Sequence, residues 1–177
     1  MPEIIASTPI YQGRIFDVRV DDVRNGEDEY KREVVAHRGS AVIIPVFADN
    51  TIAMVRQYRH AANVFLLEVP AGSLDKGEAS PEACAARELE EEIGVVAEKL
   101  EKITEFYVSP GFLTEKMYVY LATGLSETQQ NLDIDEVLEI ERHTFPEAFA
   151  MIRNGDIQDA KTMLALIFAG PRFGFTF

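Results

Sequence analysis

Apolar and polar side chains alternate loosely along the N-terminal part of the chain, between residues 10 and 24. A period of two residues is typical of a β-strand with one face buried. The dipeptide Asn25-Gly26 follows, which favours the two-residue turn of a β-hairpin, and the chain then leads back to Val35. We therefore expect a small antiparallel β unit within residues 1–38.

The rest of the chain, residues 39–177, has the pattern of mixed strands and helices. The predicted strands, separated by turns such as Asp49-Asn50, cover residues 41–47, 51–59, 65–69, 97–108, 115–121 and 137–145. Amphipathic helices are expected at 146–154 and 158–169, and a polar, acidic loop at 125–135. Such a mixture predicts an α/β sandwich.

A further helix is predicted between residues 81 and 93. Ser80 and Pro81 are a typical N-cap and first-turn pair, and Gly94 lies where a helix normally stops. At 100° per residue, two sets of side chains separate around this helix. The carboxylates of Glu88, Glu91 and Glu92 share one face, and Ala86, Leu89 and Ile93 share the face that we expect to pack.

Three carboxylates on one helix face have two interpretations. A charge run is usually a solvated surface. However, like charges three and four positions apart repel and weaken a helix unless a cation offsets them. Hard divalent cations require several converging oxygens, and Mg²⁺ is typically held by a few carboxylates, water and substrate phosphates. A divalent metal site is therefore the more specific hypothesis.

Composition limits the possible partners. The 177 residues are 47% apolar, which indicates a globular protein with a sizeable core. The formal charge of −13 and the pI near 4.6 argue against nucleic-acid and membrane partners, because phosphate backbones require a basic surface. Metal ions and local arginines would have to offset this charge if the ligand were a phosphate ester.

Cysteine content and apolar runs indicate the compartment. Cys84 is the single cysteine, so an internal disulfide is excluded and a reducing environment is expected. The sequence shows no secretory signal, and its longest apolar runs, such as residues 163–170, are too short to cross a bilayer. We therefore expect a cytoplasmic protein.

The carboxylate helix carries a specific motif. It reads Arg87-Glu-Leu-Glu-Glu-Glu-Ile-Gly-Val95, and Gly72 and Glu78 precede it. This pattern closely resembles the Nudix box, the signature of Mg²⁺-dependent hydrolases of nucleoside diphosphates linked to another moiety. One departure is that eight residues, not the usual seven, separate Glu78 from Arg87. The resemblance implies the Nudix α/β/α sandwich with a mixed sheet.

Segments outside the box resemble the ADP-ribose pyrophosphatase branch of that family. They are residues 55–59 (VRQYR), 67–72 (LEVPAG) and 109–111 (SPG), with Pro110 sixteen positions after Gly94. The resemblance implies hydrolysis of ADP-ribose to AMP and ribose 5-phosphate in a homodimer. Another nucleotide sugar, such as GDP-mannose or ADP-glucose, is an alternative substrate. A non-catalytic ADP-ribose sensor is a second alternative, although all three box carboxylates are present.

The predicted metal ligands follow from the chemistry of a phosphoanhydride. Its hydrolysis requires neutralised phosphoryl groups, a positioned water and a base. We expect Glu88 and Glu92 to bind Mg²⁺ directly, with Mn²⁺ as a possible substitute. Glu91 is the next candidate, together with the carbonyl of Ala71 or Gly72. Glu91 and Glu92 thus also count as catalytic candidates. By the resemblance, Arg87 anchors the loop rather than binding substrate.

The base is expected in the acidic loop before the last strand. The resemblance implies a glutamate there, and we choose Glu136, with Asp135 as the alternative. A loop carboxylate can move within hydrogen-bond reach of the attacking water. The plain alternative is that both are ordinary solvated loop acids.

Substrate contacts are expected from three sources. Arg59, Arg56 and Glu68 can contact the nucleotide and diphosphate, because a guanidinium binds phosphate and a carboxylate accepts hydrogen bonds from amino or hydroxyl groups. Pro110 accompanies this substrate class in the resembling enzymes, although it could be only a turn former, and the arginines only solvated charges. The same resemblance implies that Arg32 and Phe16 act across the dimer, in the partner's site.

Overall fold

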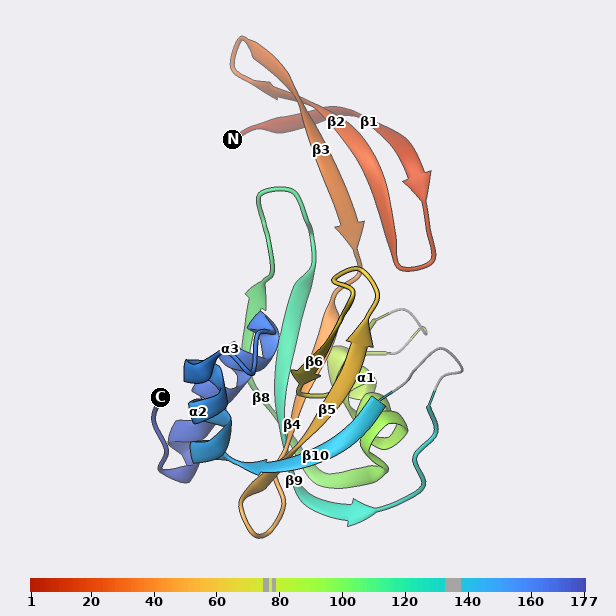
Figure 1. Cartoon of the computed structure of the whole chain (residues 1–177). Coiled ribbons are helices and arrows are strands. Elements are labelled where there is room, and N and C mark those ends of the chain that lie inside the picture. Colours follow the sequence, from red (N-terminus) through yellow and green to blue (C-terminus); the bar gives the residue numbers. More distant parts are fainter. Residues whose placement is uncertain (75–76, 78, 133–137) are drawn as a thin grey trace.

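The computed structural model of the chain describes residues 1–74, 77, 79–132 and 138–177. The expected base Glu136, its alternative Asp135 and the loop residue Glu78 lie outside the described residues. Figure 1 shows a small N-terminal sheet standing apart from a larger body of strands and helices.

The N-terminal sheet consists of β1 (Glu3–Gln12), β2 (Phe16–Asn25) and β3 (Asp28–His37), in the order β1-β2-β3 and with antiparallel neighbours. The predicted hairpin forms, but its two-residue loop is Gly26-Glu27, since Asn25 pairs with Asp28, and Gly26 has φ +67°. The expected single strand over residues 10–24 is wrong, because the chain turns at Gly13. Its amide donates to the carbonyl of Phe16 at 3.2 Å and to Asp17 Oδ1 at 3.1 Å.

The body contains two further sheets. One has the order β10-β5-β6, and the other has the order β7-β4-β9-β8. β4 and β9 are parallel, whereas their other neighbours are antiparallel, so this sheet is mixed. The strands are β4 (Ser40–Pro45), β5 (Thr51–Arg59), β6 (Val64–Glu68), β7 (Ala71–Ser73), β8 (Val95–Tyr107), β9 (Lys116–Glu127) and β10 (Leu138–Thr144). β9 is longer than the predicted 115–121 and takes up the start of the expected acidic loop.

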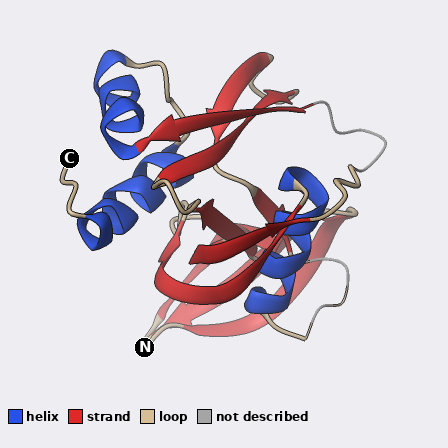
Figure 2. Ribbon diagram, turned by 90° about the horizontal axis from the view of Figure 1, so that it is seen from below, coloured by secondary structure: helices blue, strands red, loops and turns tan. Residues whose placement is uncertain are grey.

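Helices cover the strands on both sides, which gives the α/β/α layering that the resemblance implied (Figure 2). On one side are α1 (Pro81–Glu88) and its π-helical continuation η1 (Leu89–Ile93). On the other are α2 (Phe145–Asn154), α3 (Ala160–Ala169) and the 3₁₀ turn η2 (Gly170–Phe173). Fully buried side chains form one core under α2 and α3, with Phe145 and Leu166, and a second under α1, with Ile43 and Leu89.

The N-terminal sheet is joined to the body by the tip of the β8–β9 hairpin. The Val35 amide donates to the carbonyl of Phe112 at 2.8 Å, and the Thr114 amide donates to the carbonyl of Val35 at 3.0 Å. The His37 amide adds a bond to Thr114 Oγ1 at 2.8 Å. Within the described residues, no helix is long and apolar enough to cross a membrane.

Candidate active site

The helix that carries the box begins and ends where the sequence predicts. The Ser80 hydroxyl accepts from the Ala83 amide at 3.2 Å, Pro81 follows, and Gly94 adopts φ +70°. Its second half, Leu89–Ile93, is a π-helix rather than a regular α-helix. π-helical turns inside α-helices are rare and often lie at functional sites.

The predicted separation of faces is only partly right. Leu89 and Ile93 are buried as expected, but Ala86 is exposed, and Cys84 and Ala85 pack in its place. Glu88 and Glu92 are buried too, with 6% and 2% of their surface exposed. At 100° per residue, Ala85, Glu88, Leu89 and Glu92 share about 100° of the helix circumference, so the buried face lies between the two sets that the prediction separated. Only Glu91 of the three predicted ligands is partly exposed.

Gly72 and Glu88 are in close contact. A Cβ placed on Gly72 would lie 1.8 Å from Glu88 Oε1, so no other residue type fits there without displacing the carboxylate. The loop Ala71–Ser73 is held as strand β7 against β4 by antiparallel pairing. The backbone of Ala71 and Gly72, whose carbonyls are predicted metal donors, is therefore packed beside a buried carboxylate.

Arg87 connects the helix with this loop. Its Nη1 lies 2.5 Å from Glu88 Oε1 and 2.7 Å from Glu91 Oε2, and its Nη2 donates to the carbonyl of Ser73 at 3.5 Å. A guanidinium between two carboxylates offsets their mutual repulsion. This is the arrangement expected of a side chain that anchors the loop to the helix.

The donors at this position are those that a hard cation prefers. They are carboxylate oxygens of Glu88, Glu91 and Glu92 and backbone carbonyls of the adjoining loop, without competing sulfur or imidazole ligands in the predicted set. Among the residues that the structure describes, however, no group of three or more acidic, His or Cys side chains is already arranged around one point. The chemistry of the donor set fits a divalent cation, and the packing of Gly72 on Glu88 places two kinds of donor side by side.

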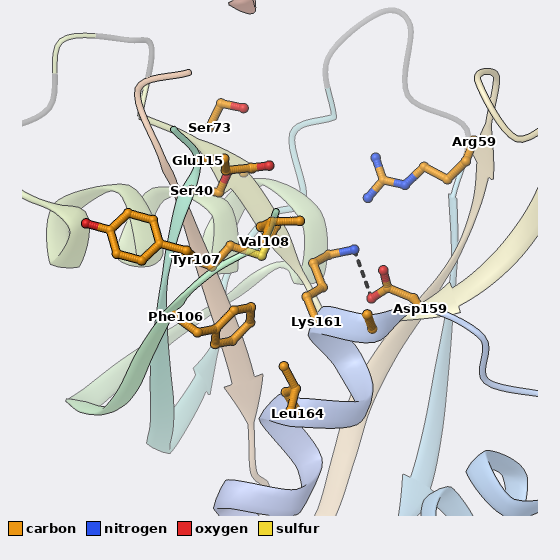
Figure 3. Close-up of a pocket in the computed structure, with 14 residues that line it drawn as sticks. Ser40, Arg59, Ser73, Phe106, Tyr107, Val108, Glu115, Asp159, Lys161 and Leu164 are labelled. Atoms are coloured by element: carbon orange, nitrogen blue, oxygen red, sulfur yellow. Dashed lines mark hydrogen bonds and ion pairs between the residues drawn. The ribbon is translucent and has the colours of Figure 1, made fainter. Parts of the chain in front are cut away.

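A cavity of about 350 Å³ opens beside Gly72 and extends toward α3. Figure 3 shows Arg59 of β5 and Lys161 of α3 pointing into this cavity, with Phe106 and Leu164 forming an apolar wall. Of the predicted site residues, Arg59 and Ala71 line this cavity. The other lining residues are Ser40, Gly72, Ser73, Phe106, Tyr107, Val108, Glu115, Met117, Asp159, Ala160, Lys161 and Leu164.

Glu68 holds the two cations of the cavity. It is 1% exposed and accepts two bonds from Arg59, at 2.7 Å from Nε and 2.5 Å from Nη2. Lys161 Nζ bonds to the same carboxylate and lies 3.0 Å from Asp159 Oδ2. Burial raises the pKa of Glu68, but the hydrogen bond from Arg59 and the charges of Lys161 and Arg59 outweigh it, and the pKa lies below its usual value.

Glu68 therefore has a different position from the one that we expected. Its carboxylate is buried behind Arg59 and Lys161, so in this arrangement it orients cations rather than offering an acceptor to solvent. The same hydrogen bond raises the pKa of Arg59, so the guanidinium is charged at every relevant pH.

The remaining predicted contacts lie away from the cavity. Arg56 pairs with Glu141 at 2.6 Å and lines a separate hollow of about 260 Å³ with Phe65 and Leu138. Pro110 is exposed at the tip of the β8–β9 hairpin. Arg32 and Phe16 are exposed on the N-terminal sheet, where Arg32 stacks on the ring of Tyr30 at 4.2 Å. A single chain does not bring these residues to the cavity.

Several residues of the cavity are not among those that the sequence predicted. Lys161 and Asp159 lie at the start of α3, and Glu115 accepts a 2.6 Å bond from the hydroxyl of Ser40, which lines the same cavity. Asp159 could have been found as an N-cap, because its carboxylate accepts from the Thr162 amide at 2.9 Å. No local pattern signals that Lys161 meets Glu68, since 93 positions separate them.

The model of one protein family, described as the NUDIX domain, matches residues 37–166. The chain belongs to this family. The Nudix match begins at the end of β3 and runs through most of α3, so it includes the box helix, the loop at Gly72 and the cavity. The chain is thus a hydrolase acting on phosphoanhydride bonds, as its sequence predicted.

Relatives of this Nudix protein differ in their named activities. An ADP-ribose pyrophosphatase of Bacillus subtilis (strain 168) is 43% identical and covers 92% of this chain and 89% of its own. A methanol dehydrogenase activator of Bacillus methanolicus is 41% identical with the same coverage. A GDP-mannose pyrophosphatase of Yersinia pestis (strain Pestoides F) is 33% identical and covers 89% and 83%.

A solved structure supports the fold. The crystal structure of an ADP compounds hydrolase superposes with a TM-score of 0.80, covering 98% of this chain and 94% of that one at 23% identity. The Nudix fold that the resemblance implied is confirmed, together with its α/β class.

Proposed function

We propose that this Nudix protein is a Mg²⁺-dependent pyrophosphatase that hydrolyses ADP-ribose to AMP and ribose 5-phosphate. The observation that carries the proposal is the cavity in which Arg59 and Lys161, both held by Glu68, lie with the loop at Gly72, and Gly72 in turn is packed on the buried Glu88. The 43% identity with an ADP-ribose pyrophosphatase over 92% of the chain supports the choice of substrate.

The cavity holds two cations that can bind a diphosphate beside the proposed metal site. The protein as a whole is strongly acidic, with a formal charge of −13, so a diphosphate can bind only where local cations outweigh that field. Arg59 and Lys161 are two such cations, but Glu68 and Asp159 offset their charge, so the proposed metal ions must supply the excess positive charge. Guanidinium and ammonium groups bind phosphate oxygens through charge-assisted hydrogen bonds, which are stronger than neutral ones.

The proposed reaction is a hydrolysis at one phosphorus. A water oxygen forms a new P–O bond, the bond to the bridging oxygen breaks, and the bridging oxygen leaves with the other phosphate. The water proton passes to a carboxylate base, for which Glu136 is the first candidate and Asp135 the second. Glu88, Glu91, Glu92 and the Ala71 or Gly72 carbonyl would hold Mg²⁺, or Mn²⁺ in its place. The bound cation supplies charge neutralisation at the phosphoryl oxygens.

A second candidate substrate is another nucleotide sugar. The 33% identity with a GDP-mannose pyrophosphatase over 89% of the chain favours this alternative. Both substrates contain the same diphosphate, so Arg59 and Lys161 serve either one. The enzyme would then have to distinguish the nucleobases and the sugars of these substrates through the apolar wall and through polar groups such as Glu115.

A direct assay decides between these substrates. Purified protein is supplied with Mg²⁺ and with ADP-ribose, GDP-mannose or ADP-glucose, and phosphate release is followed with a coupled phosphatase. The proposal predicts the highest kcat/KM for ADP-ribose. A higher value for GDP-mannose would replace the substrate, and a preference for a nucleoside triphosphate would overturn the assignment to this branch.

The proposal includes a homodimer in the cytoplasm, with residues 1–38 as the dimer-forming unit. The N-terminal sheet supports it, because β1 is exposed along its whole length and carries Ile4, Ile10 and Tyr11. Exposed apolar clusters of this kind mark interaction surfaces. In the dimer, Arg32 and Phe16 would reach the partner's site. Light scattering gives the mass in solution, and a monomer at assay concentration would refute the proposed homodimer.

A further inference from the structure

The C-terminal end of the box helix is closed by the segment Thr128–Asn131, here called the helix-end clamp. The Gln130 side chain donates from Nε2 to the carbonyl of Glu92 at 2.6 Å. The Asn131 amide donates to the carbonyl of Glu91 at 3.1 Å. Two successive carbonyls of the box helix are therefore bonded to a segment that lies 38 to 40 positions further along the chain.

Thr128 adds two contacts to the clamp. Its amide donates to the carbonyl of Gly94 at 2.8 Å, and its hydroxyl donates to Glu90 Oε1 at 3.2 Å. The contacts thus involve Glu90, Glu91, Glu92 and Gly94, which are four of the five residues 90–94. The helix-end clamp thus bonds three backbone carbonyls and one side chain at this end of the helix.

Gly94 is packed directly under Gln130. A Cβ on Gly94 would lie 3.1 Å from the backbone nitrogen of Gln130 and 3.4 Å from the Gln130 Cβ, and Gly94 also has φ +70°. A glycine is thus favoured here for two reasons, its left-handed backbone and the close approach of the helix-end clamp. This close packing fixes where Gln130 stands relative to the helix.

The helix end needs such a partner. The last four carbonyls of a helix lack partners within the helix, and here that end is a π-turn, in which each carbonyl bonds one residue further along than in an α-helix. A side-chain or backbone N–H that bonds such a carbonyl determines the orientation of the peptide. The carbonyls in question belong to Glu91 and Glu92, whose carboxylates are proposed metal donors.

We propose that Gln130 is a positioning residue of the metal site, which holds the Glu91–Glu92 backbone in its π-helical conformation through the bond to the Glu92 carbonyl. The inference rests on the proposed metal-binding role of this helix. Gln130 does not contact the substrate; its effect is transmitted through Glu92. Outer partners of metal ligands commonly change metal affinity by 10-fold or more when they are removed.

The test compares four variants for Mn²⁺ binding by titration calorimetry, without substrate. Gln130→Ala removes the donor, and Gln130→Glu keeps the shape but places an acceptor carboxylate against the Glu92 carbonyl. Gln130→Lys keeps a donor and adds a positive charge where a helix C-terminus favours one. Gln129→Ala changes the exposed neighbour and is the matched control.

We expect Gln130→Ala and Gln130→Glu to bind Mn²⁺ about 10-fold more weakly than the unchanged protein. Gln130→Lys should lose about threefold or less, and Gln129→Ala should bind normally. In assays with saturating Mg²⁺, Gln130→Ala and Gln130→Glu should regain most of their kcat, with the KM for substrate nearly unchanged. Circular dichroism confirms that each variant is folded, and if Gln130→Ala is not, the pair Gln130→Glu and Gln130→Lys carries the comparison.

Equal Mn²⁺ affinity in all four variants would overturn the role of Gln130 and leave the metal site intact. An equal loss in Gln130→Lys and Gln130→Glu would also contradict it, because the donor would then be irrelevant. If the unchanged protein bound no Mn²⁺, the metal-binding role of the helix would be refuted, and the inference with it.

Discussion

Gly72 and Glu88 are packed so closely that a Cβ on the first would lie 1.8 Å from a carboxylate oxygen of the second. The contact joins the loop before the box helix to the first carboxylate of the helix. The two come from separate elements, β7 and α1, and Gly72 also lines the cavity. This close contact is the physical reason why Gly72 is a glycine.

We predict that Gly72→Ala abolishes hydrolysis almost completely, with kcat/KM reduced by about 10²-fold or more, because the added methyl displaces Glu88 by more than an ångström. The control is Gly155→Ala, at the end of α2. This glycine has φ +83° and no atom within 4 Å of its Cβ position. The control should lose about 1–2 kcal/mol of stability but keep its kcat. Steady-state kinetics and thermal denaturation measure both, and normal activity of Gly72→Ala would contradict the packing argument.

The predicted base is tested by two substitutions. Glu136→Gln should lower kcat by about 10²-fold or more, because the variant cannot accept the water proton. Metal affinity should be nearly unchanged. Asp135→Asn is the comparison, and it should retain most of the activity. If instead Asp135→Asn had the large effect and Glu136→Gln a small one, the two roles would be exchanged.

Much of this fold could be predicted from local patterns. The helix limits at Ser80-Pro81 and Gly94 depend on capping, and the hairpin at Asn25-Gly26 depends on turn chemistry, so neighbouring residues suffice. The π-turn over Leu89–Ile93 could not be predicted, because Gln130 and Asn131 bond its carbonyls from a distant part of the sequence.

The candidate site shows the same division. Glu88, Glu91 and Glu92 could be found because they share one helix and one motif. The pairing of Glu68 with Lys161 could not, since no periodicity relates β6 to α3. Glu68 was accordingly expected to contact the substrate, whereas the structure buries it behind two cations. The proposed roles of Arg32 and Phe16 require a second chain, which the sequence of one chain does not position.

Glu68 should also make stability depend on pH. Its pKa is lower in the folded protein than in the unfolded chain, because Arg59 and Lys161 outweigh the cost of burial. The stabilisation is therefore present above the unfolded pKa, about 4.3, and is lost as the pH falls through the folded value. We predict that the free energy of unfolding falls less steeply between about pH 5 and pH 3 in Glu68→Gln than in the unchanged protein.

Urea denaturation at several pH values measures this slope. The matched control is Glu139→Gln, since Glu139 is an exposed residue of β10. It should leave the slope unchanged. Parallel curves for Glu68→Gln and the unchanged protein would show that the Arg59–Glu68–Lys161 network does not contribute to acid stability.

The hydroxyl of Thr162 links the end of β6 with the start of α3. Thr162 is fully buried, and its Oγ1 accepts from the Val69 amide at 2.9 Å and donates to Asp159 Oδ2 at 2.6 Å. Val69 follows Glu68, and Asp159 pairs with Lys161. One hydroxyl thus fixes the distance between the end of β6 and the start of α3, from which Glu68 and Lys161 extend.

We predict that Thr162→Val, which keeps the shape and removes the hydroxyl, destabilises the protein by about 1–3 kcal/mol, because the Val69 amide stays buried without its acceptor. It should also raise the KM for ADP-ribose several-fold with a smaller effect on kcat, since Lys161 loses its fixed position. Thr162→Ser keeps the hydroxyl and loses only a methyl group, at a cost of about 1 kcal/mol. Its KM should stay near that of the unchanged protein. Equal KM values for the valine and serine variants would show that the hydroxyl has no part in positioning the cations.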